Sequence, residues 1–240
     1  MLMVITLVVH AITCQLYFVG YNGYMDPHRG FTFELTGGAL CLDFINTLDR
    51  RNDRRGEEDH LPSYGHLLAW CRQTRALPRP ELAQLARRAR HQARRAQATL
   101  RLAIRLREAL YRIFSAVAAG HAPAEADLRL LNTWAAVALS SQRLAHRGRR
   151  FLWEWRQVGS DLRRPLWPVV RSAVELLTSE QRSGVRECAA QTCSWLFMDH
   201  SRNRSRRWCN MAVCGNRAKA RRFYRRTRST GRSRRAMRST

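Results

Sequence analysis

Apolar residues recur at helical spacing along most of the middle of the chain, with polar residues between them. Ser63 stands where a helix N-cap is expected, and Gly120 with Pro123 stops the longest periodic stretch. The segments expected to be helical are residues 39–51, 61–77, 80–119, 123–139 and 162–178. The pattern therefore predicts a predominantly helical body.

Strand patterns are few and short. Phe31–Leu35 alternates and is rich in β-prone residues, and Phe151–Trp155 is typical of a short strand or an apolar edge. No repeat of 20–50 residues is visible in the sequence. The expected fold class is mostly α with a minor β component, in which a helical N-terminal domain precedes a small cysteine-rich module and a basic helix.

The first residues are apolar but do not form a standard targeting segment. No Lys or Arg precedes Arg29, and the apolar run Met1–Val9 is too short to span a bilayer. We expect translation to begin at Met25, with a membrane or export role and a local strand as the alternatives. The expected domains are an extension (1–24), a helical domain (25–180), a cysteine-rich module (181–228) and a basic disordered tail (229–240).

Positive charge is concentrated toward the end of the chain. The formal net charge is +25, and residues 181–240 contain 17 Lys and Arg against 2 Asp and Glu. A hydrophobic content of 45% supports a folded core, so wholesale disorder is excluded. This asymmetry indicates a polyanionic partner that binds mainly the C-terminal quarter.

The cysteines fall into two groups. Three are scattered, and the last four follow the spacing C-x4-C-x15-C-x4-C: Cys188, Cys193, Cys209 and Cys214. Four thiolates in two pairs suit one closed, tetrahedral, structural zinc ion. Four reduced cysteines packed as small hydrophobic residues, or an iron–sulfur cluster, are the alternatives. The odd total of seven argues against a secreted disulfide framework and favours a reducing, cytoplasmic compartment.

A basic segment follows the fourth cysteine and has helical spacing. On a helical wheel Arg217, Arg221 and Arg225 share one arc, whereas Ala220 and Phe223 are expected to face the metal module. Between the cysteine pairs, four apolar residues are expected to form the core of the module: Trp195, Leu196, Phe197 and Trp208. A helix held in this way can lie in a DNA groove or along phosphates. The candidate nucleic-acid contacts are Arg204, Arg206, Arg207, Arg217, Lys219, Arg221, Arg222, Arg225 and Arg226.

The segment "CAAQTCSWLFMDHSRNRSRRWCNMAVCGNRAKARRFYRR" closely resembles the CGNR zinc-finger domain of bacterial proteins. Upstream, "GGALCLDFINTL" and two later helical segments look like the ABATE domain that usually precedes this finger. Together the resemblance covers about residues 30–226. It implies a stress-related transcription regulator of bacteria that binds DNA through its basic zinc finger.

The resemblance also draws attention to the "LDFINT" signature. Asp43, Asn46 and Thr47 match it and fall on one to two turns of the first expected helix. They are candidate ligand-binding residues if the upstream domain senses a small molecule. A structural role is favoured, because buried polar groups normally satisfy neighbouring backbone.

The expected function is therefore a zinc-dependent, DNA-binding transcription regulator associated with the nucleoid. An RNA-binding or ribosome-associated zinc module is the alternative, since phosphate attraction does not separate the two nucleic acids. No membrane partner is expected, and a homodimer is compatible with the sequence. We expect no enzymatic activity, because the sequence contains no P-loop, G-x-S-x-G, HExxH or dinucleotide fingerprint.

Overall fold

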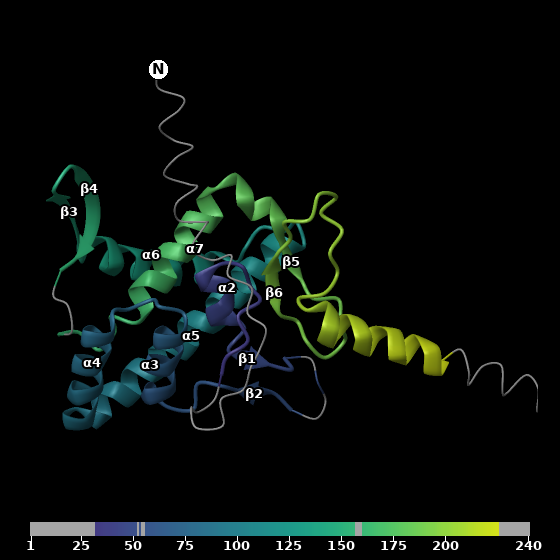
Figure 1. Ribbon diagram of the computed structural model, residues 1–240, viewed down its shortest axis with the longest axis horizontal. Helices are drawn as coiled ribbons and strands as arrows, with labels where there is room; N and C mark the ends of the chain where they lie inside the picture. The colour runs from purple at the N-terminus through teal and green to yellow at the C-terminus, as the bar shows by residue number, and fades with distance from the viewer. Residues whose placement is uncertain (1–31, 52, 54–55, 157–159, 226–240) are drawn as a thin grey trace, which may run out of the picture. The chain divides into compact units, whose positions relative to one another are not determined.

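A computed structural model describes residues 32–51, 53, 56–156 and 160–225 of the chain (Figure 1). The expectations for the extension 1–24, for a start at Met25 and for the tail 229–240 concern residues outside this part. The described residues from Phe33 onward belong to one compact unit. Among the described residues, no helix is both long and apolar enough to cross a membrane.

Helices dominate the described residues, as the hydrophobic pattern predicts. Their bounds are α2 Leu40–Ile45, α3 Tyr64–Gln73, α4 Arg79–His91, α5 Ala93–Ala118, α6 Glu125–Ser140 and α7 Leu166–Thr178. The predicted cap of α3 is confirmed, because the Ser63 hydroxyl accepts a hydrogen bond from the backbone N–H of His66. The expected fold class, mostly α with a minor β component, is confirmed.

Two of the expected helices differ from the structure. The helix expected over residues 39–51 ends at Ile45, and residues 48–49 form a strand instead. The helix expected over residues 80–119 is two helices, because the backbone of Gln92 leaves the helical region (φ −128°, ψ 50°). Similar Ala- and Arg-rich sequence on both sides conceals that break.

The described strands form three separate two-stranded antiparallel sheets. They pair β1 Leu48–Asp49 with β2 Glu58–Asp59, β3 Gln142–Arg147 with β4 Arg150–Trp155, and β5 Val185–Glu187 with β6 Leu196–Met198. Strand β4 confirms the strand expected at residues 151–155.

The strand expected at Phe31–Leu35 is wrong for residues 32–35, which are not in a sheet. The backbone of Phe33 instead pairs with the side-chain amide of Gln73, which accepts at 2.9 Å and donates at 2.6 Å. A side chain that satisfies both backbone groups replaces the neighbouring strand. The alternating sequence therefore has a local partner that its pattern does not reveal.

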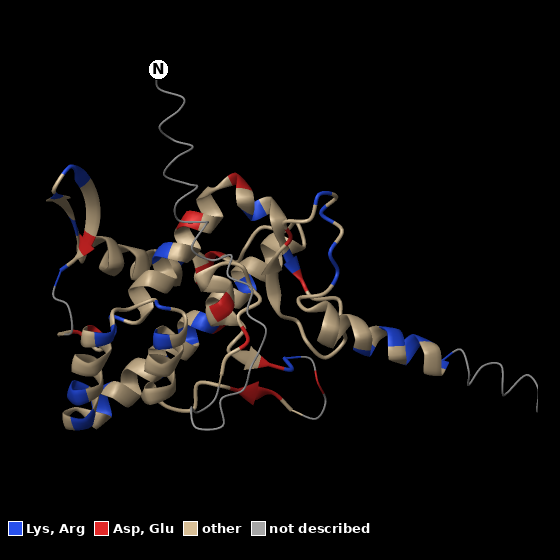
Figure 2. Ribbon diagram, in the orientation of Figure 1, with Lys and Arg blue, Asp and Glu red and all other residues tan. Residues whose placement is uncertain are grey.

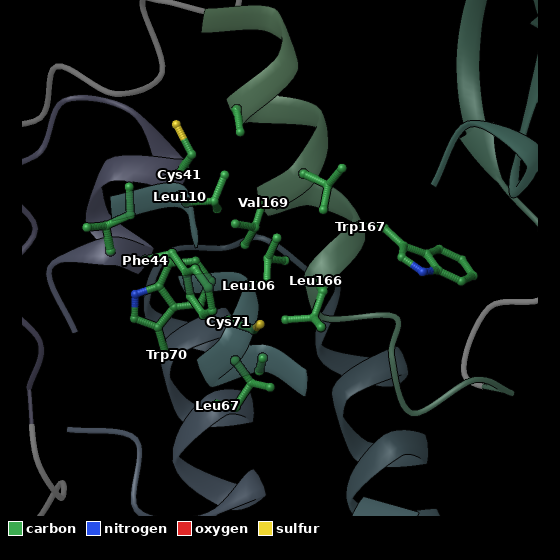
Figure 3. Close-up of a cluster of buried hydrophobic side chains, with 14 of the residues drawn as sticks. Cys41, Phe44, Leu67, Trp70, Cys71, Leu106, Leu110, Leu166, Trp167 and Val169 are labelled. Carbon is green, nitrogen blue, oxygen red and sulfur yellow. The ribbon is translucent and has the colours of Figure 1, made fainter. Parts of the chain in front are cut away.

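The main hydrophobic core lies between α2, α3, α5 and α7 (Figure 3). Phe44 of α2 meets Trp70 of α3 edge to face, with ring centroids 5.3 Å apart, and Leu106 of α5 and Val169 of α7 lie beside them. Each such side chain stabilises the fold by about 1.5–3 kcal/mol when fully buried. Helix α2 is short, so these contacts hold it more than its own hydrogen bonds do.

Two arginines lie inside this body and are paired there. Arg164 is 2.8 Å from Glu81, both side chains are almost fully buried, and the guanidinium lies over Trp155 at 4.8 Å. Arg107 donates to both carboxylate oxygens of Asp59 at 2.8 Å and thereby joins β2 to α5. Removal of either member of the Arg164–Glu81 pair would leave a buried charge uncompensated, which is costly.

Candidate metal centre and nucleic-acid interface

Two short turns bring the four cysteines of the module together. Cys188 follows β5, and Cys193 precedes β6 after a turn in which its N–H donates to Ala190 O at 3.1 Å. The second pair begins at Cys209 and ends in the π-helical turn η2, Met211–Gly215, where Cys214 N donates to Asn210 O at 2.9 Å. Each C-x4-C segment therefore turns both of its sulfurs to the same point.

The four sulfur atoms all lie within 4.8 Å of one another, and all four residues are buried. The Cys193 and Cys209 sulfurs are 3.6 Å apart, and those of Cys209 and Cys214 are 3.7 Å apart. Zinc–sulfur bonds of about 2.3 Å at tetrahedral angles require sulfur–sulfur distances of about 3.8 Å. The donor set and its spacing therefore fit a tetrahedral metal ion such as zinc.

Proton affinities within the cluster are strongly divided. Hydrogen bonds from the thiols of Cys193 and Cys209 lower the pKa of Cys188, so a thiolate is favoured at that position. Hydrogen bonds with Cys188 and Cys193 raise the pKa of Cys209, so a protonated thiol is favoured there in the absence of a metal. Four thiolates this close together need a cation, since a metal ion replaces their protons. Cys209 N–H also donates to the Cys188 sulfur at 3.5 Å.

Strand β6 faces two hydrophobic cores at once. Trp195 and Phe197 pack with the four cysteines, with Trp208 beside them, as the sequence predicts. Leu196, which was expected in the same small core, instead packs into the main core of the helical body together with Met198. Alternation along the strand explains this difference, because successive side chains point to opposite faces. The finger and the helical body are therefore joined through one strand.

Asn46 connects the "LDFINT" segment to that strand. Its side-chain amide donates to Leu196 O at 2.8 Å, and its side-chain oxygen accepts from Leu196 N at 3.0 Å. Asn46 is buried, with 3% of its surface exposed. Nearby, the Trp195 indole N–H donates to Leu48 O at 3.3 Å. This pairing joins residues 150 positions apart, and no spacing rule would predict it.

Asp43 holds a second contact between the same parts. Its carboxylate accepts from Gly37 N at 2.8 Å, while Gly37 O accepts from Met198 N at 2.8 Å. A Cβ at Gly37 would lie 2.8 Å from Asp43 N, so only glycine fits this approach. Burial raises the pKa of Asp43 to about 7, against which the hydrogen bond from Gly37 acts only in part.

Thr47 completes the signature inside the body. Its hydroxyl donates to Phe44 O at 2.8 Å and accepts from the guanidinium of Arg107 at 3.2 Å. Asp43, Asn46 and Thr47 are thus all buried and all bonded to this chain. A described pocket of about 370 Å³ lies elsewhere, beside Arg75 and Leu82. The contacts favour a structural role for the signature over ligand binding.

The loop between the cysteine pairs uses some of the candidate basic residues for its own structure. Although burial opposes its charge, Asp199 has a lowered pKa because it accepts from Ser201 N and Arg206 N, each at 2.9 Å. The Arg206 guanidinium lies 4.5 Å over the Phe197 ring and donates to Trp208 O at 2.9 Å and to the carbonyl of residue 209. Arg206 therefore braces the finger.

Residues 216–225 form the basic helix, which continues directly from the turn that carries Cys214 (Figure 1). Arg217 reaches Thr192 at 3.4 Å, and Arg221 reaches Gln191 at 3.3 Å, so their side of the helix faces the first cysteine turn. The expectation that Ala220 and Phe223 face the module is wrong, because both are exposed, Phe223 by 64%. With so few apolar residues, the inner side is set by polar contacts to that turn.

The structure thus separates the candidate nucleic-acid residues by their contacts. Figure 2 shows Lys and Arg on the basic helix and the preceding loop, without Asp or Glu on that helix. Arg204 donates to Ser183 at 2.8 Å, and the Arg207 guanidinium lies 5.2 Å over Trp208. The basic residues of the helix that are exposed and make no described contact to the first cysteine turn are Lys219, Arg222 and Arg225. Arg226 lies outside the described residues.

Comparison with known protein families gives two matches along the chain. Residues 38–180 match the ABATE family model, described as "Putative stress-induced transcription regulator". Residues 185–227 match the model of the CGNR zinc finger, a range that contains all four clustered cysteines. A search of curated proteins gives no match.

Proposed function

Because the chain belongs to the ABATE family and carries a CGNR zinc finger, we propose that it is a DNA-binding transcription regulator of the bacterial cytoplasm. One structural zinc ion, held by Cys188, Cys193, Cys209 and Cys214, fixes the orientation of the basic helix 216–225. The helix then contacts the phosphates of duplex DNA. The protein acts by binding rather than by catalysis.

The observation that carries this proposal is the charge of the segment that the cysteines hold. Residues 200–225 contain nine Lys and Arg and no Asp or Glu. On the helix, Lys219, Arg222 and Arg225 are exposed and make no described hydrogen bond or ion pair within the chain. Their charges are therefore available to phosphates, whose condensed counterions they would release.

The zinc ion would supply folding energy rather than a reactive site. Four cysteine ligands close the tetrahedron, so no coordination position remains for a water or a substrate. The small core around Trp195 and Phe197 is limited, so the metal would contribute much of the stability of the finger. The orientation of the helix depends on η2, which contains the ligand Cys214.

A charge-removal variant tests the contact helix. We expect the triple variant Lys219→Ala, Arg222→Ala, Arg225→Ala to bind duplex DNA more weakly, because each side chain neutralises a phosphate. The slope of log affinity against log salt should become shallower by about 3 units. Fluorescence anisotropy of a labelled duplex over a salt series measures both quantities.

The matched control removes the same charge elsewhere. Arg87, Arg90 and Arg94 are exposed on α4 and α5, and their triple alanine variant should bind DNA almost as the wild type does. An equal loss of DNA affinity in both triple variants would contradict the assignment of the contact helix. The attraction would then come from the net charge of the whole protein. Competition between duplex DNA and structured RNA at fixed salt tests the alternative, an RNA-binding module.

A further inference from the structure

The hairpin β3–β4 carries an apolar face that the described chain does not cover. The register places Leu144 opposite Trp153 and His146 opposite Phe151, so these four side chains share one face. Leu144 is 58% exposed, Trp153 56% and Phe151 71%. His146 stacks on Phe151 with ring centroids 4.7 Å apart. No Lys, Arg, Asp or Glu lies on this face of the two strands.

The charges of the two strands are gathered on the opposite face. Glu154 accepts from Arg143 at 3.0 Å and from Arg147 at 2.9 Å. These three residues alternate with the apolar ones, so the hairpin is amphipathic. In a protein with a net charge of +25, an uncharged face of this size is distinctive. It selects a partner that presents an equally uncharged, apolar surface.

The hairpin is held to the body mainly at its base. Trp155 packs against Trp167, with ring centroids 5.7 Å apart, whereas the turn between β3 and β4 extends away from the helices (Figure 1). A two-stranded hairpin is marginally stable in water unless its apolar face is covered. The exposed face of Leu144, Phe151 and Trp153 therefore lacks the cover that its composition requires.

We propose that this face binds the same face of a second copy of the chain, so that two hairpins pack face to face around a two-fold axis. A two-fold contact needs a self-complementary surface, and an uncharged aromatic face is one. The exposed parts of Phe151 and Trp153, counted in both copies, would bury on the order of 500 Å² of surface in this contact. The leucines and neighbouring backbone bring the total toward the ~1,200 Å² at which specific interfaces begin.

The charged residues of the strands do not oppose this contact. Arg143, Arg147 and Glu154 lie on the outer faces of the paired hairpins, away from the two-fold axis. An anionic membrane surface would instead favour basic residues around the apolar ones on the same face. The dimer holds independently of the basic helix and does not require that the protein bind DNA.

Sedimentation equilibrium of the full-length, zinc-loaded protein without nucleic acid tests the contact. We expect the mass of two chains for the wild type and of one chain for the variant Leu144→Ser, Phe151→Ser, Trp153→Ser. Phe151→Arg provides a second variant with a single change, which places an unpaired charge inside the apolar contact. Leu152→Ser, on the opposite face, is the control and should keep the mass of two chains.

Circular dichroism and metal content must be unchanged in the variants, so that loss of the dimer is not loss of the fold. A wild-type mass of one chain at micromolar concentrations would overturn the proposal. So would a dimer that survives both Phe151→Arg and the triple change. Binding to vesicles of phosphatidylcholine and phosphatidylglycerol by a monomeric wild type, abolished by Phe151→Arg, would assign the face to a membrane and also overturn it.

Discussion

Asn46 does for Leu196 what a neighbouring strand would do, since one side chain satisfies both backbone groups of that residue. Gln73 makes the same arrangement with Phe33. At the residue scale, the "LDFINT" signature therefore attaches the finger to the helical body. The sequence draws attention to Asp43, Asn46 and Thr47 as a polar set, but their partners lie too far along the chain to be predicted.

The variant Asn46→Ala should lower the free energy of unfolding by about 2–4 kcal/mol, because the N–H and the carbonyl of Leu196 would be buried without partners. Urea unfolding followed by circular dichroism measures the change. Asn132→Ala on the exposed side of α6 is the matched control and should change stability by less than about 0.5 kcal/mol. An equally small change in the free energy of unfolding for Asn46→Ala would refute its role in attaching the finger to the body.

The charge of Asp43 should make stability depend on pH. Burial raises its pKa to about 7 in the folded chain, so the folded state holds the proton more tightly than the unfolded state. Stability from this group is therefore present at low pH and is lost as pH rises toward and through 7. Asp43→Asn keeps an acceptor for Gly37 N but carries no charge.

The asparagine variant should be more stable than the wild type at pH 8 by about 2 kcal/mol or more, and the difference should shrink toward pH 5. Urea unfolding of both proteins across this range gives the difference, from which effects of pH on other groups cancel. A difference that does not vary with pH would show that Asp43 has an ordinary pKa.

At the scale of elements, β6 is shared between the metal centre and the helical body. Trp195 and Phe197 face the cysteines on either side of Leu196, which faces α2 and α5 with Met198. Zinc binding should therefore stabilise residues outside the finger. The sequence predicts both the cysteine cluster and the helices, because each depends on local spacing. It does not predict that one strand joins them, since either face of a three-residue strand could serve either core.

Hydrogen exchange tests this coupling. After chelation the amides of Leu196 and Met198, which donate to Asn46 and Gly37, should exchange at least about tenfold faster, equivalent to about 1.4 kcal/mol. The amide of Leu131 on α6 serves as the internal control and should change less, since α6 packs against α5 and α7 rather than the finger. Restoring zinc should restore protection. An unchanged exchange rate at Leu196 in metal-free protein would show that metal binding in the finger is not coupled to the stability of the body.

At the scale of the whole molecule, the protein is a helical body joined to a four-cysteine finger that exposes a basic helix. Composition and cysteine spacing predict this order, and the family matches agree with it. The sequence does not predict which arginines remain exposed. The Arg206 guanidinium contacts the Phe197 ring and the Trp208 carbonyl, and Arg217 donates to the Thr192 hydroxyl. Tertiary contacts such as these decide the direction of each side chain, and the sequence does not reveal them.

The central claim is that a metal ion held by the four cysteines keeps the basic helix in position for DNA. Its most direct test is the duplex-DNA affinity of one preparation before chelation, after chelation and after zinc is restored, with metal content measured each time. The account predicts one zinc per chain. It also predicts that the affinity for duplex DNA falls when the metal is removed and recovers when zinc is restored. Full affinity in metal-free protein would contradict it.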